Sequence, residues 1–236
     1  MHNETSHQYD YPGSSRPCQG GDLIGSKKMS IKSFFSKQAK KPSGLFGRLV
    51  MSRVFDLGNV VLNDFMKELL LLEENDHVLE IGSGTGKLIN EMATLLDKVF
   101  IEGIDFSKTM VAVAQRKNRK HISIGKVNIR HGDFEKIAYR DNSFDKICSA
   151  NTVYFWSAPD DYVKKIFRIL KPDGKLLLAF EDKKQLEKRQ LSADVFHLYS
   201  RDQIEDLLQR NGFGKGIDIL SREKKSKRYN CAVAVK

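Results

Sequence analysis

The chain has 236 residues, of which 40% are hydrophobic and 30% are charged, and its formal net charge is +10 at pH 7. These values are ordinary for one α/β domain with extensions, and the longest apolar cluster, residues 69–72, falls far short of the roughly 20 residues that span a bilayer. The three cysteines, Cys18, Cys148 and Cys231, lack metal-ligand spacing, so we expect no metal site. No signal peptide is evident, so we expect a cytoplasmic protein.

The first 72 residues precede the main pattern and divide into two parts. Residues 1–28 lack periodicity and are rich in Gly, Ser, Pro and His, which predicts a disordered extension. Residues 29–72 predict a helical N-terminal cap: a basic and aromatic stretch comes first, and residues 60–72 then repeat apolar side chains with the period of a helix. The basic stretch can pack on the domain, cap a substrate pocket or contact anionic lipid, so peripheral membrane contact remains open.

A glycine-rich turn then separates a strand, predicted over Val78–Ile81, from a helix predicted over Leu88–Leu96. Glycine occupies every second position of the turn: Gly82, Gly84 and Gly86. This arrangement brings backbone N–H groups and a helix N-terminus against a ligand. Glu80, just before the turn, favours a cationic or hydroxyl-bearing ligand over a bare phosphate. A dinucleotide turn needs G-x-G-x-x-G, and Lys87 occupies the last of those positions, which disfavours a NAD-dependent oxidoreductase.

The second predicted strand, residues 99–105, ends at Asp105, and Ser107 is well placed to cap a helix over Lys108–Lys117. A carboxylate about 20 residues after a glycine turn, at the end of the second strand, suits hydrogen bonds to ribose hydroxyls. The competing interpretation is a solvated loop aspartate.

The remaining segments continue the alternation of strands and helices. We expect strands over 127–134, 144–151 and 175–180, and helices over 161–170, within 183–195 and over 201–210. Ser157 and Asp160 have the spacing of a capping box, as do Ser200 and Gln203. Two last strands, near 216–220 and 229–235, predict a hairpin joined by the basic turn 222–228. The pattern therefore predicts an α/β fold with a mostly parallel sheet and helices on both faces.

Several motifs in this order resemble those of class I S-adenosylmethionine (SAM) dependent methyltransferases. The first is Glu80 followed by the alternating glycines, the second is Asp105, the third is Gly132-Asp133-Phe134, and the fourth is the run Leu170–Lys175 before an apolar strand. The resemblance covers about residues 45–236, on the branch of ubiquinone and menaquinone biosynthesis. It implies a Rossmann-like fold with a seven-stranded sheet, an antiparallel C-terminal strand, and a SAM-binding domain over residues 73–236.

The resemblance also implies a cofactor site. Its expected members are Glu80, Gly82, Ser83, Gly84, Gly86, Asp105, Phe106, Met110, Asp133, Phe134 and Asn151. Phe106 and Met110 would flank the adenine, and Asp133 would accept a hydrogen bond from its exocyclic amine. Tyr154 and Trp156 fall where the family places the methyl-transfer face and could line a substrate pocket, although Trp156 could equally pack on the next helix.

The resemblance implies a methyltransferase that acts on a small-molecule or lipid-like acceptor by in-line displacement. An RNA or protein methyltransferase is the alternative that the net charge suggests, and Ala150–Val153 lacks the N-P-P-Y-type motif of enzymes that methylate planar amines. A non-catalytic SAM-fold binding module is the third alternative. Alignment of the reactants needs no dedicated base; His131 and His197 are weak candidates, so no catalytic residue is assigned. The acceptor and the oligomeric state cannot be read from the sequence.

Overall fold

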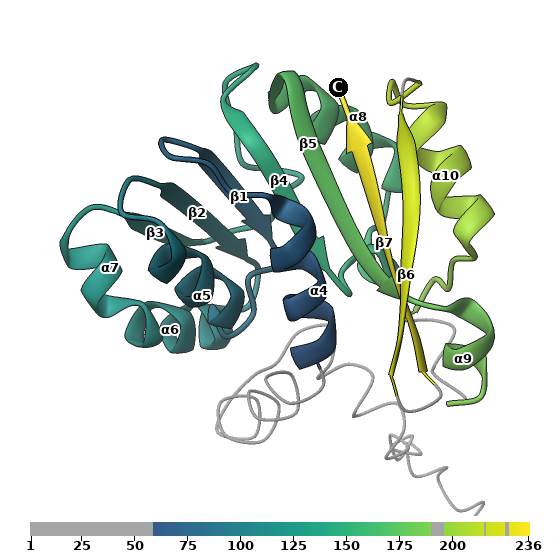
Figure 1. Ribbon diagram of the computed structural model, residues 1–236, viewed down its shortest axis with the longest axis horizontal. Helices are drawn as coiled ribbons and strands as arrows, with labels where there is room; N and C mark the ends of the chain where they lie inside the picture. Colours follow the sequence, from purple (N-terminus) through teal and green to yellow (C-terminus); the bar gives the residue numbers. More distant parts are fainter. Residues whose placement is uncertain (1–58, 190–195, 215, 225–226) are drawn as a thin grey trace, which may run out of the picture.

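The structure is a computed structural model that describes residues 59–189, 196–214, 216–224 and 227–236 (Figure 1). Its helices are α4 (Val60–Leu70), α5 (Lys87–Leu95), α6 (Lys108–Lys117), α7 (Arg119–Ser123), α8 (Pro159–Ile169), α9 (Lys183–Glu187) and α10 (Arg201–Gln209), with one 3-10 turn, η2 (Val153–Phe155). Its strands are β1 (His77–Ile81), β2 (Phe100–Asp105), β3 (Val127–His131), β4 (Phe144–Ala150), β5 (Leu170–Glu181), β6 (Ile217–Lys224) and β7 (Lys227–Val235). The expected extension 1–28 and the basic stretch before residue 59 lie outside the described residues, so the domain boundaries stay a prediction.

The strands form one seven-stranded sheet in the order β3-β2-β1-β4-β5-β7-β6. The first five strands pair in parallel, while β7 is antiparallel to both β5 and β6. The strand order reverses between β1 and β4, and in open α/β sheets ligands bind at such a switch point, beyond the carboxyl ends of the strands. The expected Rossmann-like fold with an antiparallel C-terminal hairpin is therefore confirmed.

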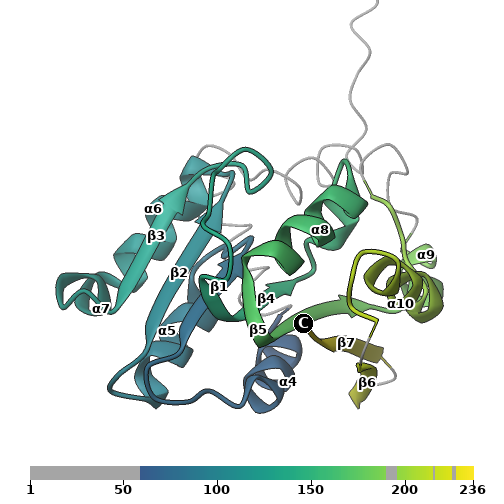
Figure 2. The ribbon, with the colours of Figure 1, turned by 90° about the horizontal axis from the view of Figure 1, so that it is seen from above.

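Helices cover both faces of the sheet, as Figure 2 shows for α4 and α5 on one side and α8 and α10 on the other. One buried cluster joins apolar residues of α4, α5 and α6 to alternate residues of the strands, including Val78 and Ile101. The other joins α8 and α10 to the opposite set, including Leu79 and Ile104. The wholly apolar segment 176–180 has side chains in both clusters, because a central strand is buried on both faces.

A buried ion pair fixes α4 at the amino-terminal edge of the sheet. Lys146 of β4 pairs with Asp76, and both side chains are buried. The Lys146 ammonium also donates to the carbonyl oxygen of Leu71 (2.8 Å), the left-handed residue that ends α4. The same cation thus satisfies a helix C-terminus and a buried carboxylate.

Local signals placed some element ends wrongly. The capping box expected at Ser157 is absent, because α8 begins at Pro159 with Ala158 as its N-cap, and the Ser157 hydroxyl donates instead to Glu135 (3.2 Å). The third strand ends at His131 rather than residue 134, and the basic turn expected over 222–228 is mostly strand. The capping box at Ser200 is confirmed.

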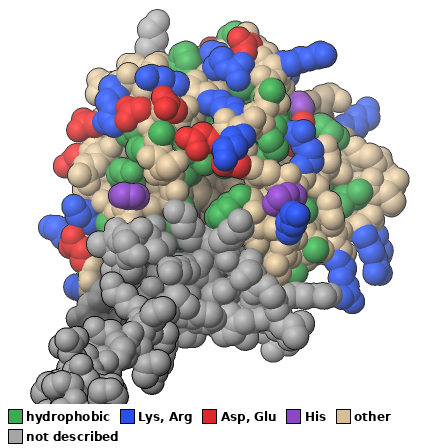
Figure 3. Space-filling model, turned by 180° about the vertical axis from the view of Figure 1, so that it is seen from behind, with side chains coloured by type: hydrophobic (Ala, Val, Ile, Leu, Met, Phe, Trp, Pro, Cys, Tyr) green, Lys and Arg blue, Asp and Glu red, His purple; other side chains and the backbone are tan. Residues whose placement is uncertain are grey.

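No helix among the described residues is long and apolar enough to cross a membrane. On the face that Figure 3 shows, acidic side chains lie among the basic ones in the upper and left parts, while the lower right carries basic side chains. The net charge therefore does not gather into one basic patch across the described part of that face.

Candidate functional site

The glycine turn after β1 requires glycine at all three of its positions. All three have positive φ, +74° at Gly82, +51° at Gly84 and +68° at Gly86. A Cβ on Gly82 would lie 2.3 Å from a methyl carbon of Thr152, and one on Gly86 would lie 2.8 Å from Cβ of Ala114, so these two are close-packed. Among the described residues, a Cβ on Gly84 would meet only the Gly82 carbonyl oxygen, at 4.0 Å. Gly84 therefore leaves open space in front of the turn.

Asp105, at the end of β2, holds the turn in place. Its buried carboxylate accepts hydrogen bonds from the N–H of Gly84 (2.9 Å) and from the N–H of Ser107 (2.8 Å). Ser107 also caps α6, as the sequence predicts, because its hydroxyl accepts from the Met110 N–H. Burial raises the pKa of Asp105, while these two backbone donors act in the opposite direction. The carboxylate has lone pairs left for a hydroxyl-bearing ligand.

Two buried polar side chains at the turn each have an oxygen atom without a hydrogen-bond partner within the described structure. Glu80 is 4% exposed and its Oε2 has no hydrogen bond, and the Ser83 hydroxyl, on a residue that is 5% exposed, has none either. Burial, and secondarily the negative charges of Asp105 and Glu91, raise the pKa of Glu80 well above its ordinary value. An unpaired buried acid next to an open glycine turn is costly in free energy and fits a cationic or donor group of a ligand.

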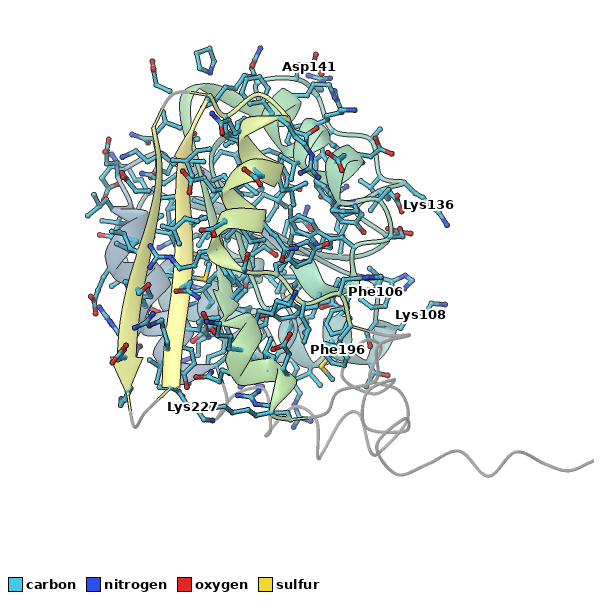
Figure 4. The ribbon with its side chains drawn as sticks, turned by 90° about the vertical axis from the view of Figure 1, so that its right-hand side faces the viewer. Phe106, Lys108, Lys136, Asp141, Phe196 and Lys227 are labelled. Atoms are coloured by element: carbon cyan, nitrogen blue, oxygen red, sulfur yellow. The ribbon has the colours of Figure 1, made fainter. Side chains whose placement is uncertain are left out.

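A hollow of about 190 Å³ opens beyond the carboxyl ends of β1 and β2. It is lined by Ile81, Gly82, Ile104, Asp105, Phe106, Gly132, Asp133, Phe134, Glu135, Thr152, Phe155, Trp156, Ser157 and Tyr162. Six of the expected site residues thus meet there: Gly82, Asp105, Phe106, Asp133, Phe134 and Trp156. Figure 4 shows the labelled Phe106 and Phe196 well away from Asp141, which precedes β4 at the opposite, amino-terminal end of the strands.

Aromatic rings form one side of this hollow. Trp156 stacks on Tyr162, with centroids 4.8 Å apart and ring planes 13° apart, and Tyr162 in turn lies 5.4 Å from Phe134. Phe155 packs on Phe196 at 4.9 Å. Trp156 therefore lines the hollow and also packs on α8, and its role toward a substrate stays a prediction.

Other expected residues lie beside the hollow but not in its lining, as far as the described residues show. Ser83, Gly84 and Gly86 belong to the turn, and Met110 is buried in the first turn of α6. Asn151, at φ +55°, donates to the Asn59 side-chain oxygen (2.9 Å) and accepts from the Tyr154 hydroxyl (3.2 Å).

Tyr154 is buried, and its hydroxyl accepts from the Glu181 N–H (2.6 Å), so it joins the segment after β4 to the end of β5. The two candidate histidines are both exposed. A ring nitrogen of His131 lies 3.2 Å from the Phe106 carbonyl oxygen, and His197 donates its backbone N–H to Tyr154. Neither the tyrosine nor the histidines are among the described residues of the lining.

The sequence does not point to several lining residues, notably Thr152, Glu135 and Tyr162. Tyr162 carries a weak signal, since it is an aromatic residue in the first turn of the helix that follows the aromatic run. Its stacking on Trp156 depends on the direction of α8, which no local pattern gives.

Comparisons with known proteins agree with this geometry. Residues 79–178 match the family described as "Methyltransferase domain". The protein YrhH of Bacillus subtilis (strain 168), named as a methyltransferase, is 31% identical over 132 residues, which are 56% of this chain and 72% of YrhH. The chain belongs to the class I SAM-dependent methyltransferases.

Two further proteins are similar to this methyltransferase. The ubiquinone/menaquinone biosynthesis C-methyltransferase of Geotalea daltonii is 31% identical over 105 residues, 44% of this chain and 45% of that enzyme. The crystal structure of a SAM-dependent methyltransferase from Aquifex aeolicus has a TM-score of 0.62 at 22% identity, and the match covers 78% of this chain and 96% of that one. This likeness supports the fold.

The described residues fit SAM as the cofactor of this methyltransferase. The orphaned Glu80 carboxyl and Ser83 hydroxyl, the open space in front of Gly84 and the buried Asp105 all lie at one turn. A doubly charged pyrophosphate would find an unpaired acid here, whereas SAM carries a positive charge and ribose hydroxyls.

Proposed function

We propose that this methyltransferase acts on a small-molecule or lipid-like acceptor. The aromatic side of the hollow, with Phe155, Trp156 and Tyr162, supports the proposal because it offers apolar surface next to the switch point of the sheet. A relative supports it too, since the Geotalea enzyme is named for ubiquinone and menaquinone biosynthesis.

The observation that carries the proposed site is the buried Asp105 carboxylate held 2.9 Å from the Gly84 nitrogen. In the proposed site, Asp105 accepts from the ribose hydroxyls, while Glu80 faces the positively charged part of the cofactor. Phe106 and Phe134 contact the adenine, and Asp133, whose side chain is 37% exposed, accepts from its amine. The hollow of about 190 Å³ is smaller than the roughly 300–1,000 Å³ of whole small-molecule sites, so it fits the nucleoside part of the cofactor.

SAM supplies an activated methyl group on a sulfonium. The chain's own contribution is orientation and exclusion of water, and holding two reactants in line can supply roughly 7–11 kcal/mol of the barrier. Buried side chains after β4 suit this role, because Trp156 is fixed by its stack on Tyr162, and Tyr154 by its bond to Glu181. We assign no general base.

The alternative functions have less support. An RNA or protein acceptor would favour a continuous basic surface, and acidic side chains interrupt the face that Figure 3 shows. A binding module without turnover is distinguished by experiment: labelled SAM and a panel of quinols, phenols, amines and lipids should give a methylated product if the proposal holds.

Replacement of Asp105 by alanine tests the cofactor site. We expect Asp105→Ala to weaken binding of S-adenosylhomocysteine by roughly 1–3 kcal/mol through lost hydrogen bonds, measured by isothermal titration calorimetry. Asp97→Ala, an exposed aspartate before β2, is the matched control and should bind normally. Equal affinity in the two variants would remove Asp105 from the site.

A further inference from the structure

Lys165 of α8 lies beneath the loop that forms one wall of the hollow. Its ammonium donates to three backbone carbonyls of that loop, those of Phe134, Glu135 (3.0 Å) and Ile137 (2.6 Å). It also lies 4.8 Å from the centroid of the Phe134 ring. An ammonium group has three protons, and each has an acceptor here.

Apolar packing and a second residue of α8 also support this loop, because Phe134 is buried in the core and Arg168 donates to the Tyr139 carbonyl oxygen (3.2 Å). Residues 132–143 are all described and contain no helix, so the connection from β3 to β4 crosses as irregular chain. Within it, Asp133 accepts from the N–H of Glu135 (3.1 Å), and Glu135 accepts from Ser157 (3.2 Å). Such local bonds shape the loop, but Lys165 joins it to a packed helix through charge-assisted bonds, which are about twice as strong as neutral ones.

The same helix also supplies a ring to the hollow. Tyr162 lies three residues before Lys165, so the two side chains share one face of α8. Tyr162 lines the hollow and lies 5.4 Å from Phe134, while Lys165 holds the backbone on which Phe134 and Asp133 stand. One face of α8 therefore contacts both the hollow, through Tyr162, and the backbone of the loop, through Lys165.

We propose that Lys165 is a positioning residue that holds the loop 133–137 in the shape that recognises the adenine amine. The inference rests on the proposed function, because it assigns Asp133 to that amine. Lys165 makes no contact with the ligand in this scheme and acts through the loop. Other nearby lysines differ: Lys136 of the loop is 82% exposed and extends into solvent (Figure 4), and Lys164 of α8 is exposed.

The test compares Lys165→Met with the matched control Lys164→Met. The probes are S-adenosylhomocysteine and S-inosylhomocysteine, in which an oxygen replaces the adenine amine, and calorimetry gives both affinities. We expect the wild-type protein and Lys164→Met to prefer the adenosyl ligand about tenfold, as the loss of one charge-assisted hydrogen bond implies. We expect Lys165→Met to bind it about tenfold more weakly and to retain a preference of about twofold or less.

The outcomes separate this inference from its premise. A Lys165→Met protein with a lowered melting temperature but an unchanged preference would show a merely structural lysine and overturn the inference. So would a wild-type protein that binds both ligands equally, although the cofactor assignment would stand. A wild-type protein that binds neither would overturn the proposed function as well. If Lys165→Met does not fold, the same two titrations on Lys165→Gln test the inference. The expected result is the same loss of preference for the adenosyl ligand.

Discussion

Glu80 is the residue whose burial is hardest to explain by folding alone. A carboxyl group that is 4% exposed with an unpaired oxygen destabilises the chain that contains it. The negative charges of Asp105 and Glu91 add to the cost of ionising this carboxyl group, since both raise its pKa. Such a group is understandable at a site where a cationic ligand supplies the missing partner.

Glu80→Gln should therefore stabilise the ligand-free protein at high pH. The pKa of Glu80 is raised in the folded state above its ordinary value of 4.5, so its favourable contribution is full below that value and is lost as the pH rises through the folded pKa. We expect the variant to gain about 1–3 kcal/mol over the wild type at pH 8, and little at pH 4. Urea unfolding at both pH values measures this, and a gain that is constant with pH would show that Glu80 does not titrate.

Gly84 and Gly86 should respond differently to alanine. Gly84→Ala should cost about 1–2 kcal/mol of stability because of its positive φ, and it should reduce affinity for S-adenosylhomocysteine more strongly than it reduces stability. Gly86→Ala should cost about 2–5 kcal/mol, because its Cβ would lie 2.8 Å from Ala114. Thermal melts and calorimetry on both variants check this, and full affinity in Gly84→Ala would mean that the ligand does not approach the turn.

Single-residue features with local causes could be read from the sequence. Asp105 and its neighbour Ser107 follow from a strand end and a helix start a few positions apart. The sequence suggests that Tyr154 lines the substrate pocket, but the described structure buries it with its hydroxyl on Glu181, 27 residues away. A hydrogen bond between residues so far apart in the sequence leaves no local sequence pattern from which it could be predicted.

At the scale of elements, the periodicity predicted most helices and strands, but packing decided their ends. The strand expected over 175–180 begins at Leu170, because Phe144 pairs with Leu170 beyond a bulge in the ladder. No pattern predicts the short α7, since five residues are too few for a helical period. The attachment of α4 likewise depends on Lys146, which lies 75 residues after its acceptor Leu71.

Lys146→Met should loosen α4 without touching the ligand site. We expect a loss of about 3–5 kcal/mol, because Asp76 would remain buried without its partner. Urea denaturation measures the loss, and Lys98→Met, on an exposed lysine, serves as the control. A loss equal to that of the control would show that water or another donor replaces the ammonium.

At the scale of the whole molecule, ligand binding should raise global stability, because the hollow joins residues from the ends of β1 and β2 to loops after β3 and β4. S-adenosylhomocysteine at 100 times its Kd should add about 2.7 kcal/mol, which corresponds to a rise of about 5–10 °C in the melting temperature for a chain of this size. Differential scanning fluorimetry measures it. NAD at the same concentration should cause no shift, and a shift with NAD alone would contradict the interpretation of the glycine spacing.

The position of β7 has a consequence for biosynthesis. This strand is the last of the sheet to leave the ribosome, yet it lies between β5 and β6 rather than at an edge. Before β7 has emerged, the backbone edge of β5 that pairs with it is open to other unpaired strands. The newborn enzyme is therefore most prone to aggregate in the interval before its final strand is inserted, and a chaperone that shields β5 during translation would protect it.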